Sequence, residues 1–260
     1  MASQERQIYD DVAGDYDIIW KTPACTIMLE LVDQQLRAMG DWKGAHVLDL
    51  ACGTGIGLRE ARKLGATSLV GVDISGEMVQ VAKESEAQIS DHHPVPLQLH
   101  VADCSQPLGH LGLEPGSFDL VIAMWLLNYA ETAEQMAAMW SNIATYLKPG
   151  GKFVGIIQNF KHVPTSVESH KYGARVSYLS KIVDGAKLHV DFSTEPKIEF
   201  DIFVLDQNVF EKTCAQAGLH DLTYVRPTKE TLSPEEQENM EWWQELIDEY
   251  PNQIVVATKA

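Results

Sequence analysis

The stretch Val47-Leu-Asp-Leu-Ala-Cys-Gly-Thr-Gly-Ile-Gly57 is the most informative part of this sequence about the fold. An apolar run (45–50) leads into a turn with glycines at positions 53 and 55, and a helical pattern (57–64) follows. Glycine suits such a turn because the chain bends sharply there and a ligand can approach the backbone closely. Free N–H groups at the start of a helix favour a carboxylate or a phosphate. The stretch therefore predicts a strand, a ligand-binding loop and a helix in succession.

The same alternation continues along the chain. Further apolar runs, each followed by a turn or a helical pattern, occupy residues 68–72, 97–101, 118–124 and 152–158. Strands that alternate with helices predict a doubly wound, mostly parallel sheet. Asp73 and Asp103 each close one of these strands. An acid at the position of Asp73 can accept hydrogen bonds from both ribose hydroxyls, which favours a nucleoside site over a simple structural turn.

The loop differs from those that bind dinucleotides or nucleoside triphosphates. A dinucleotide-binding loop would need a third glycine where this chain has Leu58, and no GxxxxGK[ST] phosphate loop occurs. The nearest rival chemistry is an NAD or nucleotide-sugar oxidoreductase on a related sheet. Leu58 and the turn at Pro149-Gly150-Gly151 argue against that interpretation.

The regions outside this alternation differ in pattern. We expect residues 1–40 to form an N-terminal helical cap, with helices over 9–20 and 26–39, and residues 160–205 to form an insertion over the mouth of the sheet. Two antiparallel strands with a turn near Glu195-Pro196 are predicted inside that insertion. These two strands are expected at 187–192 and 198–205. Strands at 222–225 and 253–258 and helices at 208–217 and 234–250 are predicted to complete the chain.

The composition limits the partners of this protein. There are 20 Lys and Arg against 37 Asp and Glu, a formal net charge of −17. A chain this acidic gains nothing from a phosphate backbone or an anionic membrane, so we expect no nucleic acid and no membrane as partner. Cys25, Cys52, Cys104 and Cys214 form no CxxC pair, which favours reduced thiols and a cytoplasmic location. No acidic cluster indicates a magnesium site, so no metal is expected.

Several motifs together resemble one known family, the class I S-adenosylmethionine-dependent methyltransferases. They are VLDLACGTG (47–55), GVDIS (71–75), ADC (102–104), FDLVIAMWLLNYA (118–130) and LKPGGKFV (147–154), which occur in the family's order and at its spacing. One departure is Ala51, which stands where the family has the first glycine of its loop. A weaker similarity, in LLNYA and the C-terminal segment, is to small-molecule methyltransferases of the toxoflavin-biosynthesis type.

The resemblance implies a single methyltransferase domain over residues 1–260. Its fold would be Rossmann-like, a doubly wound, mostly parallel seven-stranded sheet with an antiparallel last strand and a lid insertion. The cofactor would be S-adenosyl-L-methionine, and the product S-adenosyl-L-homocysteine.

The resemblance also implies which residues hold the cofactor. Gly53 and Gly55 would pass beneath its methionine part, Asp49 would anchor the loop or the amino group, and Asp73 would take the ribose hydroxyls. A sulfonium cation is attracted by desolvated tyrosine faces, which suggests Tyr9 and Tyr16 as further contacts. The full set of expected cofactor residues is Tyr9, Tyr16, Asp49, Ala51, Gly53, Gly55, Asp73, Ile74, Met78, Asp103, Cys104, Ala123 and Met124.

The sequence gives fewer signals for the acceptor site than for the cofactor site. We expect Trp20, Trp125 and Tyr129 to line the acceptor pocket. The candidate catalytic residues are Asn128, His170 and Tyr172, none of which stands out as a dedicated base.

These expectations lead to a functional hypothesis: in-line methyl transfer to a small molecule, at nitrogen by resemblance alone, in a monomer or homodimer. O- or C-methylation of a small molecule, or a non-catalytic cofactor-binding regulator, stay open as alternatives.

Overall fold

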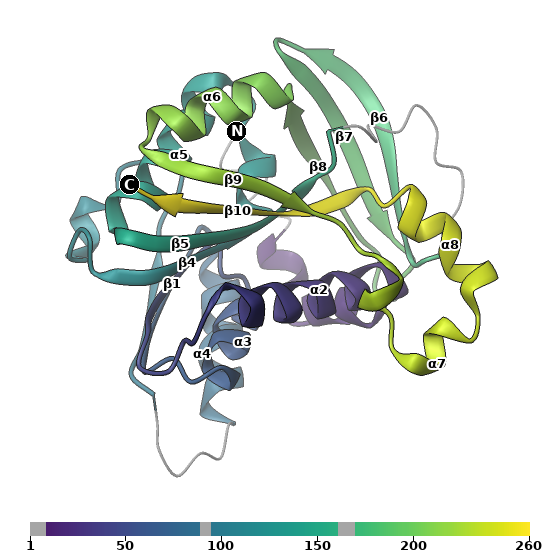
Figure 1. Cartoon of the computed structure of the whole chain (residues 1–260), viewed down its shortest axis with the longest axis horizontal. Coiled ribbons are helices and arrows are strands. Elements are labelled where there is room, and N and C mark those ends of the chain that lie inside the picture. Colours follow the sequence, from purple (N-terminus) through teal and green to yellow (C-terminus); the bar gives the residue numbers. More distant parts are fainter. Residues whose placement is uncertain (1–8, 89–94, 161–169) are drawn as a thin grey trace.

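Seven of the predicted strands form one sheet in the computed structural model, which describes residues 9–88, 95–160 and 170–260. Strand β10 pairs antiparallel with both of its neighbours, and the pairs among the first five strands are parallel. The predicted mostly parallel sheet with an antiparallel last strand is thus confirmed (Figure 1). In sheet order the strands are β3 (Leu97–Val101), β2 (Ser68–Asp73), β1 (His46–Leu50), β4 (Phe118–Met124), β5 (Leu147–Gln158), β10 (Asn252–Lys259) and β9 (Leu219–Val225).

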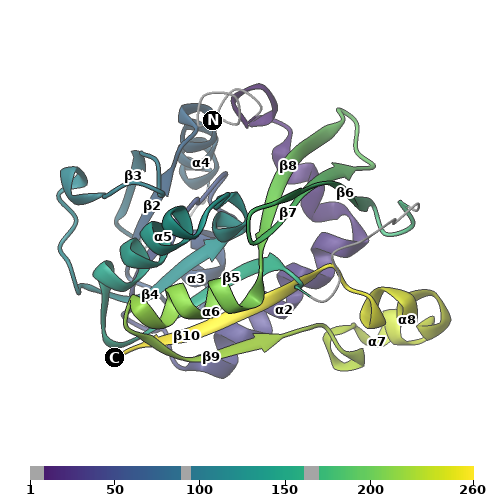
Figure 2. The same cartoon turned by 90° about the horizontal axis from the view of Figure 1, so that it is seen from above.

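Helices cover both faces of this sheet (Figures 1 and 2). Val121 and Ala123 of β4 pack into one apolar cluster, and Leu120 and Ile122 pack into the cluster on the opposite face. A strand covered on both faces favours apolar residues at successive positions, which is why β4 has a continuous apolar run over residues 120–124. One face carries α5 (Ala133–Tyr146) and α6 (Gln207–Gln216), and the other carries α2 (Pro23–Met39), α3 (Ile56–Lys63) and α4 (Gly76–Ala87).

The N-terminal segment differs from the single helix predicted over residues 9–20. Residues 9–12 are helical, residues 13–15 form a turn, and a 3₁₀ helix, η1 (Tyr16–Lys21), follows. Gly14 lies in that turn, and glycine is a poor helix former. Thr22 then caps α2 by accepting a hydrogen bond from the backbone N–H of Cys25, with Pro23 as the first helical residue. The turn redirects η1 toward the loop that follows β1.

A second sheet occupies part of the predicted insertion. It contains the two expected strands, β7 (Gly185–Phe192) and β8 (Ile198–Leu205), and a third strand, β6 (Ala174–Ile182), which the sequence did not reveal. β6 is an edge strand with a bulge between Tyr178 and Ser180, and it is largely exposed. An exposed edge strand needs no apolar run. The sequence pattern of β6 therefore resembles that of a loop.

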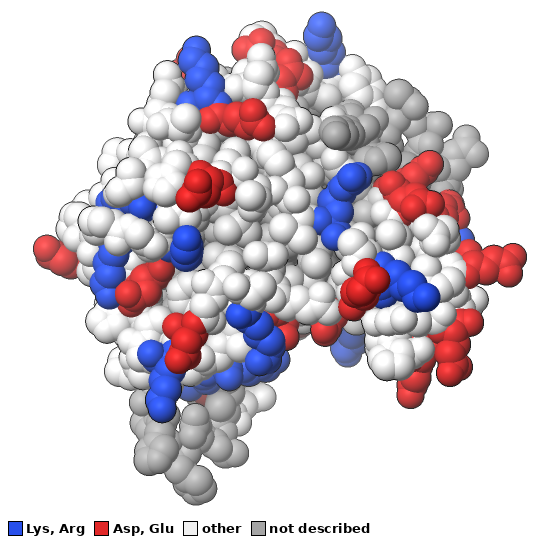
Figure 3. All heavy atoms as spheres, in the orientation of Figure 1, with Lys and Arg blue, Asp and Glu red and all other residues white. Residues whose placement is uncertain are grey.

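The C-terminal acidic segment was predicted as one helix over 234–250 and is in fact two. These are α7 (Pro234–Gln237) and α8 (Met240–Asp248), joined at residues 238 and 239. Short 3₁₀ helices complete the described structure: η2 (Gly109–Leu111), η3 (Leu126–Tyr129) and η4 (Lys229–Thr231). No helix in the described ranges combines the length and the apolar character needed to cross a membrane. Acidic and basic side chains are interspersed on the face shown in Figure 3.

Candidate functional site

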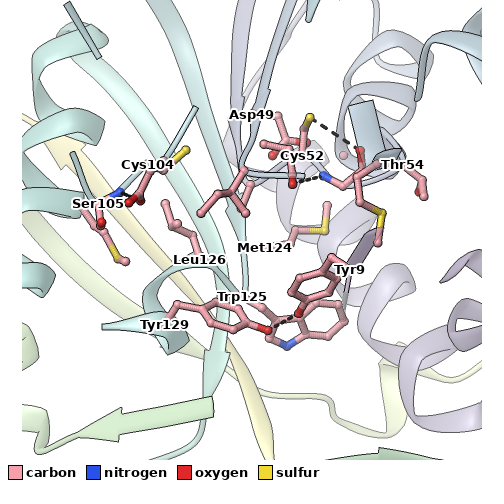
Figure 4. A pocket seen from close by; sticks show the side chains of 18 of the residues that line it. Tyr9, Asp49, Cys52, Thr54, Cys104, Ser105, Met124, Trp125, Leu126 and Tyr129 are labelled. Atoms are coloured by element: carbon pink, nitrogen blue, oxygen red, sulfur yellow. Dashed lines mark hydrogen bonds between the residues drawn. The ribbon is translucent and has the colours of Figure 1, made fainter. Parts of the chain in front are cut away.

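A cavity of about 380 Å³ opens where the carboxyl ends of β1, β2, β3 and β4 meet. Ligands bind at this edge in open α/β sheets. Figure 4 shows side chains from the loop after β1, from β4 and η3, and from the N-terminal segment converging on one space. The cavity is lined by Tyr9, Tyr16, Trp20, Asp49, Ala51, Cys52, Gly53, Thr54, Ile56, Gly57, Asp73, Ile74, Met78, Asp103, Cys104, Ser105, Gln106, Met124, Trp125, Leu126, Tyr129, Glu131, Gln135, Met139 and Phe203.

Two of the cavity residues have an unusual backbone conformation. Ala51 has φ +64° and Trp125 has φ +63°, in the left-handed region that favours glycine. The backbone N–H of Ala51 donates to the carbonyl of Val72 at 2.8 Å, which helps to hold the loop. Backbone strain of this kind costs about 1–3 kcal/mol and tends to occur at binding sites. Ala51 therefore has a backbone conformation that favours glycine, the residue that the resemblance would place there.

Asp73 organises the junction between β1 and β2. Its side chain accepts hydrogen bonds from the backbone N–H of Gly53 at 2.8 Å and of Ser75 at 2.9 Å. Burial raises the pKa of Asp73, and these backbone N–H groups oppose that shift. Each carboxylate oxygen has more than one lone pair, so the group can still accept a ligand hydroxyl.

Asp49 is a buried carboxylate with a missing partner. Its side chain is almost fully buried, and no described residue donates a hydrogen bond to Oδ1. A Cβ atom at Gly57 would lie 2.4 Å from Asp49 Oδ2, so glycine is what allows α3 to pass this close to the carboxylate. Burial, followed by the charge of Asp73, raises the pKa of Asp49. An unpaired buried acid facing a cavity is suited to bind a cationic group of a ligand.

The loop after β3 forms another wall of the cavity. Asp103 accepts a hydrogen bond from the backbone N–H of Ser105 at 2.8 Å. Asn142 of α5 donates to the carbonyls of Cys104 at 2.9 Å and Gln106 at 2.8 Å. The loop is therefore fixed against α5, and its position is set by tertiary contacts.

The N-terminal segment is tied to the cavity by polar contacts. Asp17 accepts a hydrogen bond from the Thr54 hydroxyl and pairs with Arg59 of α3 at 3.2 Å. The hydroxyls of Tyr9 and Tyr129 are hydrogen-bonded to each other, as Figure 4 shows. Residues far apart in the sequence thus close one side of the same cavity.

Aromatic rings form the side of the cavity away from the loop acids. The rings of Trp20 and Trp125 are stacked, with centroids 5.2 Å apart and planes at 26°. The ring of Tyr9 lies 6.2 Å from that of Tyr129 and 5.7 Å from that of Phe200 in β8. This side offers flat apolar surface with few polar atoms.

The predicted cofactor and acceptor residues mostly lie at this cavity. Eleven of the thirteen expected cofactor residues line it, and so do Trp20, Trp125 and Tyr129. Gly55 and Ala123 do not: Gly55 faces Ala82 of α4, and Ala123 is packed in the apolar core. Their roles as direct contacts are not supported by this placement.

The three candidate catalytic residues lie outside the cavity lining. Asn128 is buried and connects β8 to β5, donating to the Phe203 carbonyl at 3.4 Å and accepting from the backbone N–H of Gln158 at 3.3 Å. The Tyr172 hydroxyl donates to the Trp242 carbonyl at 2.6 Å. His170 is paired with Asp191 of the second sheet. Their polar groups make tertiary contacts and none of the three lines the cavity, so this placement gives no support to the predicted catalytic roles.

Several residues that line the cavity were not predicted from the sequence. Glu131, Gln135 and Met139 come from α5 and the turn before it, and Phe203 comes from β8. The only sequence signal for Gln135 was its place three residues after the N-cap Thr132, which indicates a helix start and not a ligand. Phe203 could not be predicted because no local pattern shows that β8 packs against η3 beside the cavity.

The described charged residues that line the cavity are all acidic. Its lining contains four acids, Asp49, Asp73, Asp103 and Glu131, and among the described residues no Lys, Arg or His belongs to it. Such a site favours cationic or neutral ligands over anionic ones.

Comparisons with known proteins agree with this geometry. Residues 47–151 match the protein family described as "Methyltransferase domain". The ubiquinone biosynthesis O-methyltransferase of Coxiella burnetii is 33% identical over 137 residues, which are 52% of this chain and 52% of that protein. The ribosomal protein L11 methyltransferase of Neisseria meningitidis is 34% identical over 132 residues, 51% of this chain and 37% of that protein. The chain thus spans about half the length, or less, of these curated relatives.

Solved structures show the same fold. An S-adenosylmethionine dependent methyltransferase from Mesorhizobium loti aligns with a TM-score of 0.59 at 20% identity, covering 87% of this chain and 96% of that one. The magnesium protoporphyrin IX methyltransferase of Synechocystis PCC 6803, solved with bound S-adenosylmethionine, aligns with a TM-score of 0.61 at 15% identity, covering 100% and 97%.

Proposed function

We propose that the protein transfers a methyl group from S-adenosylmethionine to a small-molecule acceptor, because residues 47–151 match the family described as "Methyltransferase domain" and the fold is that of solved S-adenosylmethionine-dependent methyltransferases. The observation that carries the proposal is the buried Asp49 carboxylate, whose Oδ1 has no partner among the described residues and which lines the cavity. The cofactor has an ammonium group on its methionine part, and a buried unpaired acid stabilises such a cation.

The described residues fit the rest of the cofactor as well. Asp73 would accept from the ribose hydroxyls, and Ile74 and Met78 offer apolar contacts beside it. When bound, S-adenosylmethionine would supply an electrophilic methyl group on a positively charged sulfur. The chain itself would orient the two reactants and exclude water, which can provide much of the rate acceleration for a displacement of this kind.

The proposed acceptor is a flat, neutral or cationic small molecule. Stacked Trp20 and Trp125, with Tyr9 and Tyr129, offer planar surfaces, and the acid-lined cavity disfavours phosphates and carboxylates. We propose nitrogen as the methylated atom, by the resemblance. A neutral amine needs no base on attack, and among the described lining residues none is a histidine or lysine.

Oxygen is the second candidate. It is favoured by the 33% identity to an O-methyltransferase of ubiquinone biosynthesis. A hydroxyl acceptor benefits from a hydrogen bond to a positioned group, and the paired Tyr9 and Tyr129 hydroxyls at the cavity could provide one.

The test has two stages. Calorimetry with S-adenosylmethionine and S-adenosylhomocysteine should show binding, and absence of binding to both would refute the proposal. Incubation with isotope-labelled cofactor and metabolite pools should then yield a product heavier by one CH₂ group, and its fragmentation identifies the methylated atom. Binding without any methylated product would favour a non-catalytic regulator instead.

A further inference from the structure

Glu131 is a cavity residue with an unexplained buried oxygen. It lines the cavity, and its Oε2 atom is buried with no hydrogen-bond partner among the described residues. Buried polar atoms are nearly always paired in folded proteins, so such an atom calls for a physical cause. A ligand donor that reaches this oxygen would provide one.

Gln135 lies beside Glu131 and is held in one orientation. Its Oε1 atom accepts a hydrogen bond from the backbone N–H of Glu131 at 2.8 Å. The amide nitrogen of Gln135 is then left as a donor, and it has no partner among the described residues. Glu131 and Gln135 together present an acceptor and a donor side by side on one wall of the cavity.

This wall faces the loop that contains Asp103. Gln135, Met139 and Asn142 follow one another at helical spacing on α5, and so share one face of that helix. Asn142 donates to the carbonyls of Cys104 and Gln106, which places this face against the loop after β3. Glu131 and Gln135 thus line the same cavity as Asp103, and α5 connects them to the loop after β3.

We propose that Glu131 and Gln135 bind the edge of the cofactor's adenine ring, an inference that rests on the proposed function. Adenine presents a donor, its 6-amino group, next to an acceptor, N7, which is the complement of this pair. The amino group has two hydrogens, so Glu131 can accept one while Asp103 accepts the other. The pair then acts as a specificity determinant for adenine over other bases.

The test compares S-adenosylhomocysteine with its 6-deamino analogue, which lacks the amino group. In Glu131→Met the affinity for S-adenosylhomocysteine should fall about tenfold, as expected for loss of a hydrogen bond to a charged group, with no change for the analogue. Glu131→Gln, which keeps an acceptor oxygen, should be intermediate. Glu134→Met, at an exposed glutamate in the first turn of α5, is the matched control and should bind like wild type.

A second pair of measurements tests Gln135. Gln135→Met should weaken binding of S-adenosylhomocysteine and leave binding of its 7-deaza analogue, which lacks N7, unchanged. Equal losses for both ligands in either variant would show a structural role and overturn the inference, as would unchanged binding of S-adenosylhomocysteine. If wild type binds neither S-adenosylhomocysteine nor S-adenosylmethionine, the proposed function itself fails, which is a distinct outcome.

Discussion

At the scale of single residues, Asp49 makes the sharpest prediction. Asp49→Asn should lower the affinity for S-adenosylmethionine about tenfold to a hundredfold, because a charge-assisted hydrogen bond is lost. The same change should not lower the free energy of unfolding, since it removes an uncompensated buried carboxylate. Calorimetry and urea unfolding measure the two effects. A variant that binds the cofactor normally would contradict the role given to Asp49.

The pH dependence of stability follows from the same residue. Burial raises the pKa of Asp49 in the folded state, whereas an unfolded aspartate titrates near about 3.9. The folded state therefore binds the proton more tightly, and this contribution is full below the unfolded pKa and is lost as pH rises through the raised folded pKa. Without ligand, wild type should lose stability relative to Asp49→Asn as pH rises above about 4. Urea unfolding over a pH series checks this, and parallel curves would contradict it.

Tyr172 shows how a polar residue in an apparent insertion can be structural. Tyr172→Phe removes the hydrogen bond to the Trp242 carbonyl and should lower the free energy of unfolding by about 1–2 kcal/mol. Cofactor affinity and the turnover rate should stay at wild-type values, because the side chain is not part of the cavity lining. A loss of turnover without a loss of stability would restore Tyr172 as a catalytic candidate.

At the scale of elements, the approach of α3 to β1 depends on Gly57. A Cβ atom there would lie 2.4 Å from Asp49 Oδ2 and 3.0 Å from the Cε atom of Met124. Gly57→Ala should therefore lower the free energy of unfolding by about 1–3 kcal/mol, the usual range for overpacking. Gly76→Ala, at the start of α4, is the matched control, because a Cβ atom there meets nothing within 4 Å. Equal stabilities of the two variants would contradict the packing argument.

The elements predicted from sequence show where local patterns suffice. The strand β4 was found within its exact bounds because its apolar run is covered on both faces, whereas β6 was missed because it is an edge strand with exposed polar positions. The N-terminal helix was predicted too long, since periodicity did not register the turn at residues 13–15. Buried elements show an apolar pattern in the sequence. Exposed segments, and segments whose course depends on contacts with distant parts of the chain, show little such pattern.

At the scale of the whole molecule, the N-terminal segment closes the site from the far end of the chain. Asp17→Asn should weaken S-adenosylhomocysteine binding several-fold, because the segment loses its pairing with Arg59. The stability should change by less than about 1 kcal/mol, since Asp17 is half-exposed. Asp33→Asn, which removes an exposed pair with Arg37 on α2, is the control and should bind normally. Unchanged binding in Asp17→Asn would show that the contact does not hold the closed arrangement.

The alternation of strands and helices, the loop after β1 and the acids at the ends of β1, β2 and β3 could be predicted from the sequence alone. These features depend on apolar periodicity and on residues within a few positions of each other, and both can be recognised in the sequence. Which polar groups reach the cavity depends on the tertiary structure. It brought Glu131, Gln135 and Phe203 to the cavity and directed Asn128, His170 and Tyr172 to other contacts. The direction of a side chain is set by the packing of distant elements, and spacing along the chain does not contain that information.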